Sequence, residues 1–403
     1  MALPQELELS RLREAHLRSA EVVTRTPALT ARSISERLGA ELVLKAESLQ
    51  RTGSFKLRGA LNKLRSVSEP LGVVAGSAGN HAQSLAYAAR AFGVACEVFM
   101  PRDASIGKLA AVRAFGAAVH QEGLTVDDSV TLARARAEET GFVFAHPFDD
   151  LDVIAGQAGV GIEVLEQEPD VDTVIVPVGG GGLICGVAAA VRQMKPGVRV
   201  VGVQTERCAP FLESPDPGAG TGEAAMTIAD GIAVKRPGTL TRPLVEGLVD
   251  DIVTVSEEWI AEAMALLLER SKLMVEGAGA ASLAAALSGA VECKGRGPTV
   301  VVLSGGNVDI GLVARITGRE EARQGRRLRL FTRISDRPGG SARLLATVAE
   351  AGANLIAVEH VRESIQLEVW ETGIALTLET RGHKHVESLR AALRAEGYES
   401  TEI

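Results

Sequence analysis

The sequence predicts an α/β protein with parallel strands joined by helices, followed by a smaller unit that mixes helices and strands. Three observations lead to this prediction. Between residues 42 and 304, short β-branched runs bounded by glycine or proline alternate with longer alanine-rich stretches of helical period, which is typical of parallel strands with crossover helices. Several runs are almost entirely apolar, as strands covered on both faces are. After Gly318 this alternation gives way to a different order of elements.

Seven runs of the first region are predicted to be strands. They cover residues 42–46, 73–75, 96–100, 173–178, 200–204, 252–255 and 299–303. Helices are expected directly after two of these strands, one reaching to about Phe92 and one beginning near Leu183. A chain of 403 residues is long enough for two or three domains.

The last quarter of the chain predicts a ferredoxin-like unit. The arginine-rich stretch at residues 319–327 is expected to be a linker, because a charge cluster is usually a solvated surface. The elements expected after it are a strand at 328–334, a turn at 336–340, a helix from Ser341, strands at 354–362 and 366–378, a helix at 385–395 and an extended tail. This order is βαββαβ over residues 328–403.

Composition excludes several classes of protein. With 46% apolar and 23% charged residues, the chain lies in the range of globular proteins, which excludes disordered and fibrous chains. Its 51 acidic and 43 basic residues give a formal net charge of −8, which argues against nucleic acid as a partner. There is no apolar run of about 18 residues and no signal-peptide core, so we expect a cytoplasmic protein without a membrane span. The four cysteines lack CxxC spacing and are expected to be buried free thiols.

Lys56 is the first residue whose position suggests chemistry. It follows a Gly-Ser turn and stands at the start of an apolar-periodic segment within ESLQRTGSFKLRG, residues 47–59. Most of the other lysines fall at loop or helix ends, where a solvated cation is the ordinary outcome. A functional role for Lys56 therefore needs support from other motifs.

Two loops between a strand and a helix are suited to hold anions. SAGNHAQ at residues 77–83 and the four glycines at residues 179–182 each follow a predicted strand and open a helix, where free N–H groups and the helix dipole attract negative charge. The four glycines have no Cβ atoms to block a phosphate. They do not match the G-x-G-x-x-G pattern of dinucleotide-binding folds, because Ile184 or Cys185 stands at the third glycine. Ser304 ends the last long strand, at the edge where ligands bind in open α/β sheets.

A lysine amine, an anion-holding loop, a phosphate cradle and a strand-end serine are together the parts that pyridoxal phosphate requires. On these parts, the sequence resembles the fold-type II pyridoxal-phosphate enzymes, and among them the threonine ammonia-lyases (threonine dehydratases) with a single regulatory domain. The matching motifs, in order, are SFKLRG, SAGNHAQ, HPFDD, GGGGL, TIADGIAV, EGAGA and SGGN. The resemblance implies a tryptophan synthase β-like catalytic domain over residues 1–318, with two open α/β subdomains and the smaller one at about 52–155.

The resemblance also implies roles for individual residues. Lys56, bonded to the cofactor aldehyde, and Ser304, facing the pyridine nitrogen, are expected to be catalytic. The expected cofactor-binding residues are Phe55, Lys56, Asn80, Gly179, Gly180, Gly181, Gly182, Leu183, Glu276 and Ser304. The substrate carboxylate is expected on Ser77, Ala78, Gly79, Asn80 and His81. His81 and His146 also match the family in residue type, but a structural role as buried histidines accounts for them equally well. No catalytic role is assigned to their rings.

The implied activity is α,β-elimination, which converts L-threonine, and L-serine, to 2-oxobutanoate or pyruvate and ammonia. Serine racemase, serine dehydratase and 3-hydroxyaspartate dehydratase are alternatives, as is an amino-acid sensor without turnover. Ala78 argues against a racemase, since racemases of this family carry a proton-transferring serine there. The serine racemases of this family also have a divalent-metal site, in which further ligands follow a residue that Glu206 matches. Leu212 stands at one of these ligand positions and cannot bind a metal, so no divalent metal is expected. Binding of a monovalent cation is left as an alternative.

The C-terminal unit resembles an ACT regulatory domain. The resemblance rests on the turn at residues 336–340 and on Gly352-Ala353-Asn354. It implies that an amino-acid effector binds at an interface between two copies of the chain. The expected effector residues are Asp336, Gly339, Gly340 and Asn354. The alternative is an oligomerisation module without a ligand, and in both cases we expect a homodimer or homotetramer. Roles in isoleucine biosynthesis and in catabolism both stay open.

Overall fold

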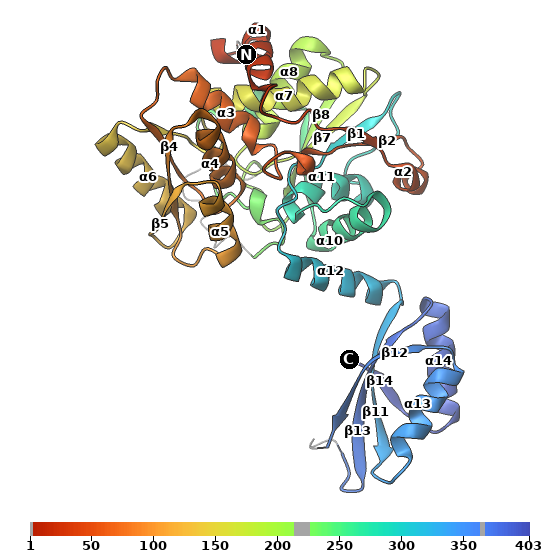
Figure 1. Cartoon of the computed structure of the whole chain (residues 1–403). Helices are drawn as coiled ribbons and strands as arrows, with labels where there is room; N and C mark the ends of the chain where they lie inside the picture. Colours follow the sequence, from red (N-terminus) through yellow and green to blue (C-terminus); the bar gives the residue numbers. More distant parts are fainter. Residues whose placement is uncertain (1–2, 213–225, 363–366) are drawn as a thin grey trace. The chain divides into compact units, whose positions relative to one another are not determined.

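The computed structural model describes residues 3–212, 226–362 and 367–403. The chain divides into two compact units, Met1–Val308 and Asp309–Ile403, which Figure 1 shows in the colours of the sequence. The first unit contains two sheets and the second contains one.

The larger sheet of the first unit has six strands in the order β1-β2-β10-β7-β8-β9. Its strands are β1 (Ala28–Thr30), β2 (Leu42–Lys45), β7 (Thr173–Pro177), β8 (Arg199–Thr205), β9 (Asp251–Val255) and β10 (Thr299–Val302). All neighbours run parallel except β1, which is antiparallel to β2. The strands β2, β7 and β10 are buried along their whole length, as their continuous apolar runs predict.

The smaller sheet has four parallel strands in the order β5-β4-β3-β6. Its strands are β3 (Gly72–Gly76), β4 (Ala95–Met100), β5 (Ala118–Gln121) and β6 (Val143–Phe144). All seven strands predicted from the sequence are present in the two sheets. The prediction missed β1, β5 and β6, which lie at sheet edges and have two to four residues each. Edge strands this short and only half-buried carry little apolar signal.

Helices surround both sheets. They are α1 (Leu9–Ser19), α2 (Arg32–Leu38), α3 (Lys56–Ser66), α4 (Asn80–Phe92), α5 (Ile106–Ala114), α6 (Val126–Thr140), α7 (Leu151–Gln167), α8 (Gly182–Met194), α9 (Thr241–Leu248), α10 (Glu257–Leu266) and α11 (Gly277–Ser288). Four shorter helical segments are η1 (Gln5–Leu7), η2 (Glu47–Leu49), η3 (Asp230–Ile232) and the π-helix η4 (Leu267–Ser271).

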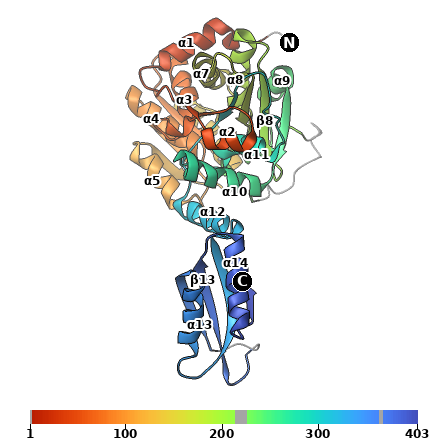
Figure 2. The ribbon, with the colours of Figure 1, turned by 90° about the vertical axis from the view of Figure 1, so that its right-hand side faces the viewer.

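Helices α7 and α8 pack on each other in the core of the larger sheet, as Figure 2 shows, whereas α3 contributes to the core of the smaller sheet and packs on α7. Glycines permit the close approach. A Cβ atom at Gly156 of α7 would lie 2.5 Å from the carbonyl oxygen of Arg58, and one at Gly186 of α8 would lie 2.5 Å from that of Ile154. This packing fixes α3, which begins at Lys56, against the rest of the first unit.

A buried network of four charged side chains anchors the same helix. Arg58 donates to both oxygens of Glu47 at 2.8 Å and to both oxygens of Glu163 at 2.7 and 2.9 Å, and the Lys45 amine lies 2.6 Å from Glu163. All four side chains are at most 1% exposed. Burial alone would raise the pKa of the Glu47 carboxyl, but Arg58 and Lys45 outweigh it and hold that pKa below its usual range.

The second unit begins with α12 (Ile310–Arg323) and continues as a single antiparallel sheet of order β12-β13-β11-β14. Its elements are β11 (Arg327–Ser335), α13 (Gly340–Glu350), β12 (Asn354–Val361), β13 (Glu371–Glu379), α14 (His383–Ala395) and β14 (Ser400–Glu402). After α12 the order is βαββαβ, as the sequence predicts. Two boundaries differ by more than two residues: α12 includes the start of the segment expected as a linker, and β13 begins at Glu371, whereas residue 366 lies outside the described residues.

None of the helices in the described ranges has both the length and the apolar character needed to cross a lipid bilayer.

Candidate active site

A cavity of about 690 Å³ in the first unit is lined by segments that follow strands of both sheets. The residues that the sequence predicts for catalysis, cofactor and substrate all line it. They are Phe55, Lys56, Ser77, Ala78, Gly79, Asn80, His81, Gly179, Gly180, Gly181, Gly182, Leu183, Glu276 and Ser304. The structure thus brings together residues from five separate segments of the sequence.

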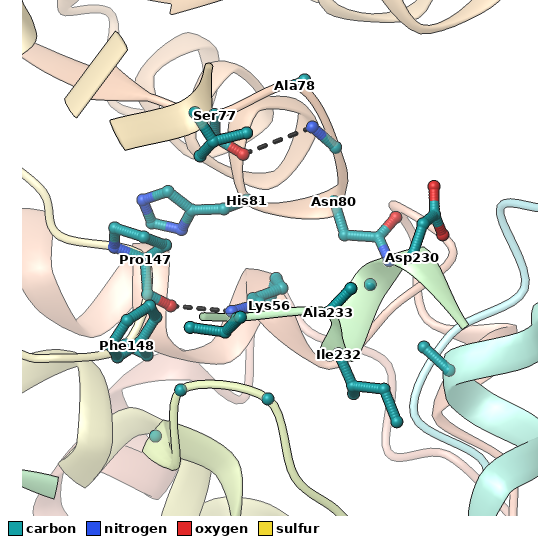
Figure 3. Close-up of a pocket in the computed structure, with 18 of the residues that line it drawn as sticks. Lys56, Ser77, Ala78, Asn80, His81, Pro147, Phe148, Asp230, Ile232 and Ala233 are labelled. Atoms are coloured by element: carbon teal, nitrogen blue, oxygen red, sulfur yellow. Dashed lines mark hydrogen bonds between the residues drawn. The ribbon is translucent and has the colours of Figure 1, made fainter. Parts of the chain in front are cut away.

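Lys56 is the first residue of α3, and its side chain is half-buried. Its amine donates a 2.7 Å hydrogen bond to the carbonyl oxygen of Pro147, drawn as a dashed line in Figure 3. Burial lowers the pKa of this amine to about 8, although the carboxylate of Glu276 acts in the opposite direction. A substantial fraction of the amine is therefore neutral near pH 8 and able to accept a proton or attack a carbonyl carbon.

Phe55 connects Lys56 with Ser304. The ring centroid of Phe55 lies 5.1 Å from the Lys56 amine, and its N–H donates to the carbonyl oxygen of Ser304 at 3.1 Å. Ser304 follows β10 and is 3% exposed. The next residue, Gly305, allows the Glu276 carboxyl to approach, because a Cβ there would lie 2.1 Å from its Oε1 atom.

Asn80 and Glu276 form the polar side of the cavity. The Asn80 amide donates to Glu276 Oε1 at 2.6 Å and accepts from the Asn307 amide at 2.7 Å. Burial, with the nearby negative charge of Asp230, raises the pKa of Glu276 to about 7, against the lowering effect of the Asn80 hydrogen bond and of Lys108. Glu276 therefore exchanges its proton near neutral pH.

The loop before α4 places helix N–H groups at the cavity. Ser77 Oγ accepts from the N–H of Gly79 at 3.3 Å, and α4 begins at Asn80. Figure 3 shows this loop together with His81 and Lys56. The first turn of a helix leaves N–H groups without intrahelical partners, so the loop is suited to hold a carboxylate.

The four-glycine loop is a cradle that side chains would fill. A Cβ at Gly180 would lie 2.3 Å from the Phe148 ring, and one at Gly181 would lie 2.8 Å from Thr241. Gly181 also has a φ of +97°, which favours glycine. Within the described ranges, the N–H groups of Gly179, Gly180 and Gly181 have no hydrogen-bond acceptor. A half-buried lysine amine and these N–H groups in one cavity fit the aldehyde and the phosphate of pyridoxal phosphate.

The two histidines of the cavity are neutral. Burial lowers the pKa of His81 to about 3 and that of His146 to about 4. His81 Nε2 lies 2.9 Å from the carbonyl oxygen of Ala145, and its buried Nδ1 has no partner among the described residues. His146 Nδ1 accepts from the N–H groups of Phe148 and Asp149 at 3.3 and 2.8 Å, so this ring holds the turn that carries Pro147.

Several residues of the site were not singled out from the sequence. Asn307 appears there only as the last letter of SGGN, although its amide binds Asn80. Pro147 acts through its carbonyl oxygen, which no side-chain motif reveals. Lys108 and Asp230 form a 2.6 Å ion pair and both line the cavity. In the sequence Asp230 is only one letter of TIADGIAV, and a single lysine near a helix start gives no signal.

Within the described parts of the chain, no group of three histidine, cysteine, aspartate or glutamate side chains is placed to hold a metal ion. Leu212, which stands at the expected ligand position of the racemase metal site, is 55% exposed.

The predicted effector residues of the second unit do not come together within one chain. Asp336, Gly339 and Gly340 follow the end of β11, and Gly339 has a φ of +90°. Asn354 starts β12 and is level with the start of β11, because both Asn354 and Arg327 pair with Glu379. The length of β11 therefore separates them, roughly 26 Å at about 3.3 Å per residue.

A family model described as "Pyridoxal-phosphate dependent enzyme" matches residues 20–305. This range contains every residue of the cavity that the sequence predicts, and the match confirms the predicted fold-type II α/β class of the first unit.

The chain is similar to known proteins, among them the following three. The L-threonine ammonia-lyase of Thermotoga maritima is 45% identical over 397 residues, which cover 98% of both chains. The crystal structure of a T.th. threonine deaminase has a TM-score of 0.69 and 43% identity, covering 75% of this chain and 99% of that one. The serine racemase of Dictyostelium discoideum has a TM-score of 0.69 and 36% identity, covering 75% and 99%.

Proposed function

We propose, since the chain belongs to the family of pyridoxal-phosphate dependent enzymes, that it is a threonine ammonia-lyase. It deaminates L-threonine, and L-serine, by α,β-elimination to 2-oxobutanoate or pyruvate and ammonia. The observation that carries the proposal is the single cavity that Lys56 and the four-glycine loop line together. The similarity to an L-threonine ammonia-lyase over 98% of both chains supports the choice of substrate.

The chain's own residues account for cofactor binding. Pyridoxal phosphate supplies an electron sink for the carbon that loses its proton. Lys56 would bond to its aldehyde, the N–H groups of residues 179–183 would hold its phosphate, and Asn80 and Ser304 would face its ring, with Phe55 and Glu276 beside it. Ser304 offers a neutral hydroxyl and not a carboxylate, so it would leave a ring nitrogen beside it largely unprotonated, which would favour elimination over transamination.

Lys56 is the residue that would move the α-proton of the substrate. A substrate amine would take the place of Lys56 at the aldehyde, and the lysine amine so released, whose pKa is about 8 without cofactor, would be neutral often enough to take the α-proton. The N–H groups of the loop at residues 77–81 hold the substrate carboxylate, which directs the α-carbon to the lysine. Holding both groups in place removes much of the entropic cost of the reaction.

Serine racemase is the second candidate, because a solved serine racemase is 36% identical to the chain. Racemisation needs a second proton donor on the opposite face of the substrate, and Ala78 offers only a methyl group. This residue favours elimination over racemisation.

A substrate panel tests the proposal. The chain loaded with pyridoxal phosphate is assayed for oxo-acid release from L-threonine, L-serine and 3-hydroxyaspartate, and for D-serine from L-serine. We expect 2-oxobutanoate from L-threonine as the fastest product. D-serine as the main product would favour the racemase, and binding of the cofactor without any turnover would favour the amino-acid sensor.

We further propose that residues 328–403 form an ACT-like regulatory domain, and that α12 and the residues up to 327 connect it in sequence to the catalytic domain. The βαββαβ order supports this, and the similarity to the Thermotoga maritima L-threonine ammonia-lyase extends over 98% of the chain and so includes nearly all of this region. Since one chain holds Asp336 to Gly340 and Asn354 at opposite ends of β11, an effector that touches both needs a second copy. We therefore propose a homodimer or homotetramer with the effector between chains.

A further inference from the structure

The turn formed by residues 146–149 contacts both the lysine and the glycine loop. The carbonyl oxygen of Pro147 accepts from the Lys56 amine, and the Phe148 ring packs so tightly on Gly180 that no Cβ fits there. Figure 3 shows Pro147 and Phe148 beside Lys56. The next residue, Asp149, reaches the glycine loop by another route.

Asp149 binds the segment that begins α9. Its Oδ1 atom accepts from the N–H groups of Leu240 at 2.9 Å and Thr241 at 3.2 Å. Its Oδ2 atom accepts from the N–H and the hydroxyl of Thr239, both at 3.0 Å. A carboxylate with four donors at the start of a helix is held firmly, and it fixes that helix start in turn.

Thr241 passes this constraint to the glycine loop. Its hydroxyl accepts from the N–H of Gly238 at 3.0 Å and donates to the carbonyl oxygen of Gly180 at 2.6 Å. The peptide between Gly180 and Gly181 is planar and trans, so its N–H points away from its carbonyl oxygen. Holding that oxygen against Thr241 therefore directs the N–H of Gly181 to the other side.

We propose that Asp149 and Thr241 are positioning residues that hold the glycine loop in the shape that binds a phosphate group. The inference rests on the proposed function, because it takes the phosphate to be that of pyridoxal phosphate. Four glycines in a row have many accessible conformations, and a loop that had to be ordered on each binding event would bind phosphate more weakly.

Asp150 is the matched control for Asp149. It lies in the same HPFDD motif and is also half-buried. Its carboxylate accepts from the N–H groups of Asp152 and Val153 at 2.9 and 3.1 Å, which caps α7, and it pairs with Lys63 at 2.7 Å. Its substitution therefore disturbs a helix start without disturbing the start of α9.

The experiment measures how much the phosphate contributes to cofactor affinity. Dissociation constants of pyridoxal phosphate and of pyridoxal, which lacks the phosphate, are measured on the full chain without cofactor. Their ratio reports the phosphate alone, because loss of Lys56 reactivity or of overall stability affects both ligands. The variants are Thr241→Val, Thr241→Ser, Asp149→Asn and Asp150→Asn.

We expect Thr241→Val to lower the preference for pyridoxal phosphate over pyridoxal about three- to tenfold, because it loses the hydrogen bond of a neutral hydroxyl. Asp149→Asn should lower this preference about tenfold or more, because it weakens the hydrogen bonds of a charged carboxylate. Thr241→Ser, which keeps the hydroxyl, and Asp150→Asn are expected to stay within about twofold of the wild-type preference. Thr241→Val at the wild-type preference, or a fall of equal size for both ligands, would overturn the inference. Wild-type protein that binds neither ligand would overturn the proposed function and the inference with it.

Discussion

The two units differ in what they do with residues that the sequence marks as functional. The first unit brings residues from five segments into one cavity. The second leaves Asp336 and Asn354, which are close in sequence, at opposite ends of β11. The reason is where each residue stands relative to a strand. Ser77, Gly179 and Ser304 each follow a parallel strand, whereas Asn354 begins a strand of an antiparallel sheet. Parallel strands end at one edge of a sheet, so position at a strand end brings residues together more than distance along the chain does.

Replacing Lys56 by alanine should have the largest effect, because it removes the amine that gives the cavity of the first unit its proposed chemistry. We expect oxo-acid release from L-threonine to fall by more than about 10³-fold, since both the covalent link and the general base are lost. Lys63→Ala, on the same helix but paired with Asp150 and Asp152, is the control and should retain turnover. Comparable loss in both variants would contradict the role of Lys56.

Breaking the buried charge network should test what fixes α3 and its lysine in place. Glu163→Gln leaves Glu47 as the one carboxylate of the network to balance the two buried cations, Arg58 and Lys45, and we expect the free energy of unfolding to fall by about 3–5 kcal/mol. Glu166→Gln on the same helix removes an exposed partner of Arg25 and should change it by less than about 1 kcal/mol. Denaturant unfolding of both variants gives the comparison, and equal values would show that the network adds nothing.

The pH dependence of aldehyde capture should sharpen the picture of the cavity. Only the neutral amine attacks, and the pKa of Lys56 is lowered by burial to about 8. The rate of pyridoxal addition to the chain without cofactor should therefore rise with pH and level off above pH 8, being roughly a hundredfold lower at pH 6 than on the plateau. A rate that keeps rising towards pH 10 would mean that the amine behaves as an exposed lysine.

A methyl group at Gly180 should test the phosphate cradle. Because its Cβ would meet the Phe148 ring at 2.3 Å, Gly180→Ala must displace the loop or the ring. We expect the affinity for pyridoxal phosphate to fall about tenfold or more, in keeping with the cost of overpacking. Gly197→Ala, where no atom lies within 4 Å, is the control, and cofactor titrations that do not distinguish the two variants would contradict the close packing.

The smallest effect should come from the second unit. Asn354→Ala removes an exposed side chain whose amide binds Glu379 at 3.1 Å, so the fold should tolerate it. If Asn354 contributes to an effector site shared by two copies, the concentration of isoleucine or valine that changes turnover by half should rise several-fold, as for the loss of one hydrogen bond. An unchanged response would favour an oligomerisation module without a ligand.

The sequence predicts the fold best where strands are buried on both faces. Residues 173–178 and 299–303 are continuously apolar, which is typical of a parallel strand covered by helices on both faces. The edge strand β5 is only half-buried and lacks such a run. The candidate site follows the same rule. Lys56 and the four glycines stand out by residue type, but the roles of Asn307 and Thr241 come from contacts with residues more than 60 positions away, which no local pattern contains.

The buried network of Lys45, Glu47, Arg58 and Glu163 has a consequence for how the first unit comes apart. Its two cations and two anions come one each from β2, η2, α3 and α7, so the departure of any single segment leaves an uncompensated charge out of contact with water. Opening one of these segments alone is therefore disfavoured relative to opening them together. Amide hydrogens in all four should exchange with solvent at one common rate, as a single cooperative block.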